Sequence, residues 1–142
     1  MAEMVEVFID SIRVSLMSPQ RVVILRQKDA DHYLPIWVGP YEAESITVAL
    51  QEVETSRPMT HDLFKSVLKV FGAVLVRVEI VALKDDTFYG NLVLNHDGQL
   101  FDVDSRPSDA IALAVRAHAP ILINRKVLDE AGIRPERDMR ED

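Results

Sequence analysis

The chain has 142 residues, of which 48% are hydrophobic and 27% charged; it has no cysteine and a formal net charge of −7 at pH 7. This composition is that of an ordinary globular domain, and it excludes disulfides, thiolate catalysis and cysteine-ligated metal centres. The negative charge argues against a protein that coats nucleic acid through its overall field, but it does not exclude local binding by a few arginines.

The first third of the chain alternates apolar and polar residues in short runs separated by turns, a pattern typical of an antiparallel meander. It predicts strands over residues 5–14, 21–27 and 32–38. Gly39 and Pro40 then open a helix, because proline is favoured at the first helical position. Helical spacing to residue 53 places these apolar side chains toward the core: Ala43, Ile46, Ala49, Leu50 and Val53.

The rest of the chain continues with a second helix over about 60–71, for which Thr60 is the expected N-cap and Gly72 the C-terminal cap. Alternation predicts the next strands over 73–83, 87–95 and 99–104. A third helix over 107–118, a short strand over 121–123 and a last helical turn or two over 126–131 complete the pattern.

The resulting order, βββ-αα-βββ-α-β, does not alternate strand and helix, so a doubly wound parallel sheet is not expected. We predict an α+β fold, a single compact domain of mostly antiparallel strands with helices packed on the sheet. Residues 1–133 form this domain, and 134–142 form a charged, disordered tail. Three aromatic residues in apolar contexts are predicted to be core residues and not base-stacking platforms: Phe8, Trp37 and Phe88.

Two similar segments carry most of the candidate chemistry: Arg57-Pro58-Met59-Thr60-His61-Asp62 and Asp104-Ser105-Arg106-Pro107-Ser108-Asp109. Each places an arginine, a hydroxyl and an aspartate where a helix begins. A helix N-terminus offers unpaired N–H groups to an anion, and arginine adds a planar fork that matches phosphate. The segments therefore predict a phosphate site, with Arg57, Thr60, Arg106 and Ser108 as contacts. The alternative is a purely structural ion-pair network, in which Arg57 pairs with Asp109 and Arg106 pairs with Asp62.

Further chemistry is open to the carboxylates and the histidine of these segments. Asp102 and Asp104 share one face of their strand by alternation, and with Asp109 they would suit Mg²⁺ or Mn²⁺, which prefer oxygen ligands. A solvated strand end with a capping aspartate explains the same residues. His61 is a candidate general base, or an exposed first-turn residue without a partner. Asp62 caps its helix, a role compatible with binding a metal.

These motifs are similar to those of the bifunctional nuclease family, long catalogued as a domain of unknown function, and the likeness runs from about residue 4 to about residue 130. The matching segments are Leu34-Pro35-Ile36-Trp37-Val38-Gly39, Glu42-Ala43, Arg57-Pro58-Met59-Thr60-His61-Asp62-Leu63, Phe88-Tyr89-Gly90, Ser105-Arg106-Pro107-Ser108-Asp109-Ala110-Ile111-Ala112-Leu113-Ala114 and Ala119-Pro120-Ile121. The resemblance, closest to bacterial members, implies a compact α+β fold that is usually oligomeric. Plant members are described as cutting both DNA and RNA.

The first functional hypothesis is a nuclease that hydrolyses DNA and RNA with Mg²⁺ or Mn²⁺. Its expected catalytic residues are Arg57, His61, Asp62, Arg106 and Asp109, and its expected metal ligands are Asp102, Asp104 and Asp109. The second hypothesis is a non-enzymatic binding or regulatory protein with an anion pocket at the two helix N-termini.

Either hypothesis implies a limited set of partners. We expect local, weak and salt-dependent contact with nucleic acid, and a homo-oligomer, a dimer or trimer. No membrane contact is expected, because no apolar run approaches the about 20 residues that a span requires. The N-terminus lacks the basic region of a signal peptide, so the expected location is the cytoplasm.

Overall fold

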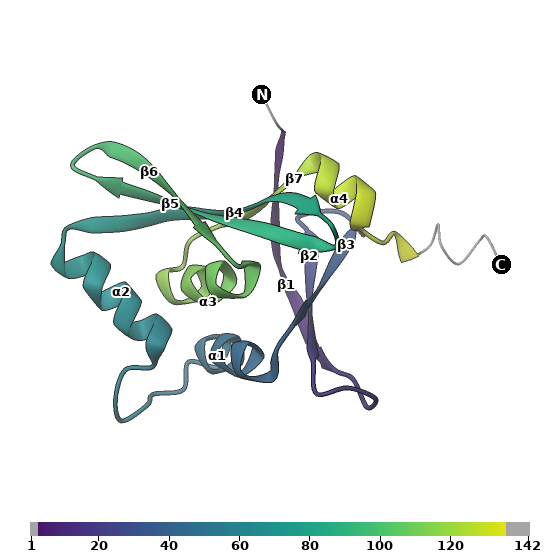
Figure 1. Cartoon of the computed structure of the whole chain (residues 1–142), viewed down its shortest axis with the longest axis horizontal. Helices are drawn as coiled ribbons and strands as arrows, with labels where there is room; N and C mark the ends of the chain where they lie inside the picture. The colour runs from purple at the N-terminus through teal and green to yellow at the C-terminus, as the bar shows by residue number, and fades with distance from the viewer. Residues whose placement is uncertain (1–2, 136–142) are drawn as a thin grey trace.

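A computed structural model describes residues 3–135 as one seven-stranded sheet with four helices (Figure 1). The strands are β1 (Met4–Val14), β2 (Arg21–Gln27), β3 (Tyr33–Val38), β4 (Ala73–Lys84), β5 (Thr87–His96), β6 (Gln99–Ser105) and β7 (Ile121–Asn124). The helices are α1 (Pro40–Leu50), α2 (Thr60–Val70), α3 (Pro107–Ala117) and α4 (Arg125–Ala131). The predicted α+β class and the order of elements are confirmed.

The sheet has the strand order β3-β2-β1-β7-β4-β5-β6, and every neighbouring pair is antiparallel except β4 and β7. Short hairpins build its two halves, β1–β3 and β4–β6, and β7 joins them after α3 has crossed the sheet. Figure 1 shows the two halves at a steep angle, with α1 and α3 inside that angle. The starts of these two helices are therefore held against the same face of the sheet.

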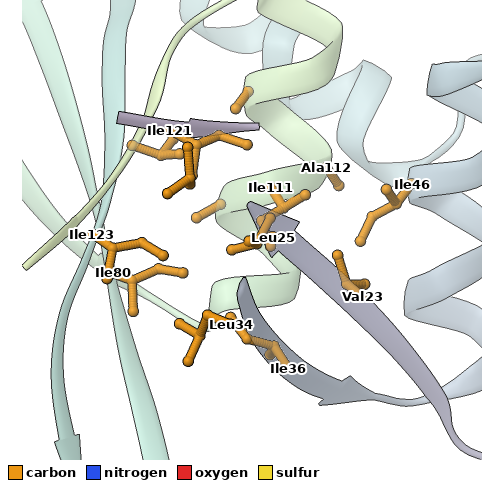
Figure 2. Packing of buried hydrophobic residues seen from close by; sticks show 14 of the residues in the cluster. Val23, Leu25, Leu34, Ile36, Ile46, Ile80, Ile111, Ala112, Ile121 and Ile123 are labelled. Atoms are coloured by element: carbon orange, nitrogen blue, oxygen red, sulfur yellow. The ribbon is translucent and has the colours of Figure 1, made fainter. Parts of the chain in front are cut away.

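The hydrophobic core fills the space between this face and the helices (Figure 2). The strands contribute fully buried branched side chains, among them Val23, Leu25, Leu34, Val78, Ile80 and Ile123. Helix α3 is buried on most sides, and its alanines at 110, 112 and 114 let the neighbouring elements approach closely. Each of the branched side chains contributes about 1.5–3 kcal/mol when it leaves water. A helix embedded in this way gives the residues of its first turn fixed positions.

Helix α1 ends earlier than the spacing predicts. The structure buries Ala43 and Ile46, whereas Leu50 and Val53 are exposed, so their predicted core positions are wrong. Glu52 adopts a φ of 53°, in the left-handed region, and the chain turns away after Leu50 before Val53 reaches the core.

Helix α2 begins with a different cap from the one expected. Its N-cap is Met59, and Thr60 is the first helical residue, so the predicted Thr60 cap is wrong. Asp62 supplies the cap, because its Oδ2 accepts a hydrogen bond from the Met59 N–H at 2.9 Å. None of the residues of α2 is buried.

The aromatic predictions divide. Phe88 packs partly buried against the core, as expected, but Phe8 and Trp37 are 44% and 58% exposed. Strand alternation explains Trp37: its neighbours Ile36 and Val38 are buried, so Trp37 points to the opposite face of β3. The prediction that Phe8 and Trp37 lie in the core is therefore wrong.

The ends of the chain complete the description. Ile133 pairs with Tyr33, which fixes the segment after α4 to β3. The predicted tail, 134–142, lies outside the described residues from position 136 on. Within 3–135, no helix is long and apolar enough to cross a membrane.

His32 is the buried titratable group beneath this C-terminal segment. It is 2% exposed, and its Nδ1 has no hydrogen-bond partner among the described residues. Burial lowers the pKa of His32 below 6.5; Arg134 and Arg125 lower it further, and Asp129 opposes them. The folded protein therefore favours the neutral imidazole.

We expect this histidine to make the fold sensitive to mild acid. Its folded pKa lies below the unfolded value of 6.5, so its contribution is complete above that pH and is lost as the pH falls through the folded pKa. Urea unfolding from pH 8 to pH 5 should show a midpoint that falls less steeply with acid in His32→Leu than in the wild type. His118→Asn, a change at an exposed histidine, should keep the wild-type slope, and equal slopes in all three proteins would contradict this role of His32.

Candidate active site

The two segments singled out in the sequence meet in space through His61 and Asp109. His61 Nε2 lies 2.8 Å from Asp109 Oδ1, and His61 Nδ1 lies 2.7 Å from the Oγ of Ser45 on α1. An ionised carboxylate only accepts hydrogen bonds, so Nε2–H donates to Asp109, and in the neutral imidazole Nδ1 then accepts from the Ser45 hydroxyl. Three helices, α1, α2 and α3, thus contribute one residue each to a continuous chain of polar contacts.

Arg106 joins this chain from the solvent side. Its Nε and Nη2 donate to Asp109 Oδ2 and Oδ1 at 2.8 and 3.1 Å, and its Nη1 lies 3.4 Å from Glu42 Oε2. The Arg106 side chain is 62% exposed, whereas those of Asp109 and Glu42 are 32% and 24% exposed. The arginine is therefore the cation that an approaching anion meets first.

These contacts determine the charge of the site. Partial burial raises the pKa of the Asp109 carboxyl, but hydrogen bonds from Arg106 and His61 outweigh it, so the net pKa lies below the ordinary value of 3.8. The hydrogen bond to Asp109 in turn raises the pKa of Arg106. Asp109 is thus a carboxylate and Arg106 a cation at neutral pH.

Asp62 forms a second and separate pair. Its Oδ1 accepts from Nε of Arg116 at 2.7 Å, and Nη1 of Arg116 donates to the Ala112 carbonyl at 3.0 Å. The Arg116 side chain is only 6% exposed. Burial raises the pKa of Asp62, but the hydrogen bonds from Arg116 and the Met59 N–H lower it more. The pair ties the start of α2 to the last turn of α3.

This pair lines a cavity of about 710 Å³, which we name the lysine groove. Its other residues come from α2 and from the C-terminal ends of α1 and α3. Its charged residues are Glu52, Asp62, Lys65, Lys69 and Arg116, and His118 also lines it. Lys65 Nζ donates to the Arg116 carbonyl at 2.9 Å. Three basic and two acidic side chains therefore line the groove, although the net charge of the protein is negative.

Comparison with known proteins identifies this domain. Residues 23–136, more than half of the chain, match the model of the bifunctional nuclease domain. The chain belongs to the bifunctional nuclease family. An uncharacterized protein of Mycobacterium tuberculosis is 41% identical over 128 residues, which cover 90% of this chain and 76% of that protein.

Plant relatives carry the family's name. Bifunctional nuclease 2 of Oryza sativa subsp. japonica is 30% identical over 121 residues, covering 82% of this chain and 37% of the plant protein. Bifunctional nuclease 1 of the same plant is 27% identical over 127 residues, covering 87% and 38%. This chain thus spans little more than a third of each plant protein.

In this domain Arg57 does not form the predicted ion pair with Asp109, and Arg106 does not form one with Asp62. Asp109 pairs with Arg106 of its own segment, and Asp62 pairs with Arg116, so the partners predicted for the structural ion-pair network are wrong. The two helix starts are nevertheless joined, through the hydrogen bond between His61 and Asp109. The alternative prediction for His61, an exposed residue without a partner, is also wrong, since its side chain is 14% exposed and both ring nitrogens have partners.

The remaining predicted contacts lie at different depths. Arg57 and Thr60 are exposed, and within residues 3–135 the Arg57 guanidinium makes no hydrogen bond or ion pair. Ser108 is 6% exposed, inside the first turn of α3. The phosphate contacts predicted at these positions are therefore on the surface at Arg57 and Thr60 and below it at Ser108.

The three carboxylates predicted to bind a metal do not converge. Asp102 and Asp104 share a face of β6 as expected, and Asp104 pairs with Asn91, whose Nδ2 donates to Asp102 Oδ1 at 2.9 Å. Leu92, the next residue after Asn91, belongs to the core, so alternation turns both aspartates away from the helices that carry Asp109. In the part of the chain that the structure describes, no three His, Cys, Asp or Glu side chains are placed to hold a metal ion.

Sequence reasoning missed Ser45 and Arg116 and did not assign Glu42 to the site. Ser45 resembles any small helix residue, and its partner His61 lies 16 residues away. Arg116 lies 54 residues from Asp62, and Glu42 lies 64 residues from Arg106. The only signal was local: Glu42 in the first turn of α1, within a segment that matches the family.

Proposed function

We propose that this domain hydrolyses phosphodiester bonds of DNA and RNA at the site formed by Arg106, Asp109 and His61. The observation that carries the proposal is the shared carboxylate of Asp109, which binds an exposed arginine on one side and a nearly buried histidine on the other. Membership of the bifunctional nuclease family supports it. The plant nucleases in which the domain is about a third of the chain support it less directly.

Arg106 holds the scissile phosphate in this proposal. Its Nη1 has only the long contact with Glu42, so it is the donor most readily transferred to a phosphate oxygen. A guanidinium placed on the transferring phosphoryl group stabilises the negative charge that develops in the transition state. Removing one such donor typically costs about 10²–10³ in turnover.

Asp109 receives the proton of the attacking water. Both ring nitrogens of His61 are engaged, so the histidine acts through Asp109, which it holds in place from below. Nη1 turns to the phosphate while Nε and Nη2 keep their hydrogen bonds to Asp109, so Asp109 stays an ionised carboxylate that can accept the proton. The water oxygen then bonds to phosphorus, the bond to the leaving oxygen breaks, and solvent protonates the leaving group.

The surrounding cations bind the polymer beyond the scissile phosphate. Lys65 and Lys69 of the lysine groove are placed for the backbone on one side of His61, and Arg57 and Thr60 lie at the start of the same helix. Contacts of this kind are electrostatic, so binding weakens steeply with salt. We propose that nucleic acid binds locally and weakly, in keeping with the net charge of −7.

The three carboxylates predicted to bind Mg²⁺ or Mn²⁺ lie too far apart in direction to hold one ion together. Asp102 and Asp104 point away from Asp109, to the far face of the sheet, where Asp102 accepts a hydrogen bond from Asn91. We therefore assign no step to a metal ion and treat its requirement as part of the test.

The proposal is tested by cleavage of labelled single-stranded DNA and RNA with Mg²⁺, Mn²⁺ or chelator. We expect cleavage that coelutes with the protein through two different columns and decreases with added salt. Activity that separates from the protein on either column would contradict the proposal, since it would belong to a contaminant. Turnover in chelator would show that the residues described above suffice.

A non-enzymatic binding protein is the second candidate, and one observation favours it. Both ring nitrogens of His61 are hydrogen-bonded, to Ser45 and to Asp109, which is typical of a histidine with a structural role. In that case Arg106 would bind an anion without turnover. Saturable binding of an oligonucleotide, with no cleavage in any metal condition, would support this candidate against the nuclease.

We also propose that the domain is a homo-oligomer that covers the apolar surface of α2. Its exposed residues are Leu63, Phe64, Val67, Val70 and Phe71. Light scattering should give a dimer or trimer for the wild type and a lower mass for Val67→Glu. A monomeric wild type at micromolar concentration would contradict this proposal. The cytoplasmic location stays a prediction.

A further inference from the structure

A second cavity, of about 330 Å³, is lined by Arg106 and shares none of its lining residues with the lysine groove. Residues from the end of β3, the β4–β5 turn and the starts of α1 and α3 line it. The residues that matter here are Trp37, Glu42, Asp86, Thr87, Phe88 and Arg106. Because it includes Trp37, we name it the tryptophan groove. It shares Glu42 and Arg106 with the site proposed above.

Trp37 is an exposed aromatic residue that lines this cavity. It is the single tryptophan of the chain, and 58% of its surface is accessible. Leaving an indole in water forgoes a large hydrophobic gain, which β-structure normally recovers by burial. Large exposed apolar surfaces in soluble proteins commonly mark binding sites.

The face of the sheet that carries Trp37, opposite to that of the buried Ile36 and Val38, also carries arginines and aromatic rings. Val22 pairs with Trp37 across β2–β3 and with Arg13 across β1–β2, so these side chains share one face of the sheet. Further along that face, the Arg26 guanidinium lies 5.8 and 5.7 Å from the ring centroids of Phe8 and Tyr33. Aromatic rings interleaved with arginines on a sheet are the usual platform for single-stranded nucleic acid.

We propose that the tryptophan groove binds one nucleobase of a single-stranded nucleic acid, stacked on Trp37, while the phosphate of the same nucleotide lies on Arg106. This inference rests on the proposed function and specifies its substrate. A cavity of about 330 Å³ is at the small end of the range for ligand sites, which suits a single nucleotide.

The polar residues of the groove match the edges of a base. The carboxylates of Glu42 and Asp86 accept hydrogen bonds, as the exocyclic amino groups of adenine, cytosine and guanine require. The Thr87 hydroxyl both donates and accepts. A base paired in a duplex has both of its faces covered by its stacked neighbours, so a site that stacks a base selects single strands.

Trp37 also supplies the readout that tests the proposal. Because it is the only tryptophan, its emission reports on this groove alone. We expect a single-stranded oligonucleotide with non-hydrolysable linkages to quench the emission in a saturable way. An oligonucleotide of the same length and charge with abasic sites throughout, and inorganic polyphosphate, should quench much less. A free nucleoside monophosphate should quench only at far higher concentration if a polymer is the ligand.

Variants separate stacking from general binding. Trp37→Leu, with binding followed by anisotropy of a labelled oligonucleotide, should bind about 5- to 150-fold more weakly, as the loss of one stacked base implies. Phe101→Leu, which replaces another exposed aromatic residue on β6, should bind as the wild type does. Trp37→Tyr, which keeps an aromatic face, should restore most of the affinity. Unfolding midpoints of all four proteins identify any variant that fails to fold.

Failure of this inference differs from failure of the nuclease proposal. Cleavage without quenching, with Trp37→Leu as active as the wild type, would overturn the tryptophan groove and leave the nuclease intact. Quenching without cleavage would support the groove and contradict the nuclease. Equal quenching by abasic and normal strands would overturn stacking, and so would an emission maximum that shifts with protein concentration, since a second copy would then cover Trp37.

Discussion

Replacing Arg106 with alanine should lower the rate of phosphodiester cleavage by about 10²–10³, while the affinity for an oligonucleotide falls far less. Arg106 donates to Asp109 with two nitrogens and carries a third near Glu42, so it is already oriented at the mouth of the site. Its loss removes a donor aimed at the transition state and leaves the buried contact between His61 and Asp109 in place. The measurement is kcat and KM on a single-stranded substrate.

Arg57→Ala is the matched control for this change. Arg57 stands in the other Arg-Pro segment, but it is exposed and its guanidinium has no partner within residues 3–135. We expect it to raise KM several-fold, to reduce the salt dependence of binding by about one phosphate contact, and to leave kcat nearly unchanged. If Arg57→Ala lowers kcat as much as Arg106→Ala, both segments act on the reacting phosphate and the present assignment of roles is wrong.

Replacing Arg116 with methionine should lower the free energy of unfolding by about 2 kcal/mol. Breaking a buried ion pair by removing one partner costs about 3–5 kcal/mol, and the partial exposure of Asp62 reduces that figure. Arg116 is 6% exposed and Asp62 is 37% exposed. The Ala112 carbonyl also loses its donor. Urea unfolding measures the change, and oligonucleotide cleavage at low temperature should persist.

Arg77→Met is the corresponding change in an ion pair with a more accessible arginine. Arg77 Nε lies 3.0 Å from Glu79, but the arginine is 33% exposed and Glu79 keeps a hydrogen bond from Asn91. The loss of stability should be under about 1 kcal/mol. A larger effect at Arg77 than at Arg116 would show that the tie between α2 and α3 is not a main element of stability.

The sequence predicted the order of elements well because each element is marked locally. Proline at the first position of α1 and α3, alternation in the strands and the turns between them all lie within a few residues. The core positions predicted at the end of α1 were wrong because the helix ends at Leu50 and Glu52 is left-handed. Nothing in the sequence marked this change of direction. The prediction for Trp37 failed for a different reason. The apolar residues 34, 36 and 38 alternate with it, and this pattern already indicated that Trp37 lies on the opposite face of the strand.

The candidate site was predictable only in part. The two segments that the sequence singled out do meet in space, but the pairing within them depends on how α1, α2 and α3 pack. His61 reaches Asp109 across 48 residues of sequence and Ser45 across 16. The convergence of Asp102, Asp104 and Asp109 could not be predicted, because alternation fixes only which residues share a face. The face of β6 that carries Asp102 and Asp104 is opposite to the helices.

The most direct test of the account is the cleavage rate of Asp109→Asn beside the wild type, both purified in parallel by the same route. Asparagine keeps the shape of the side chain but removes the charge that binds Arg106 and the base that accepts the proton of water. We predict a loss of at least about 10²-fold in cleavage of single-stranded DNA and RNA, with an unfolding midpoint close to that of the wild type. Equal rates in the two preparations would contradict the assignment of this site as the nuclease centre.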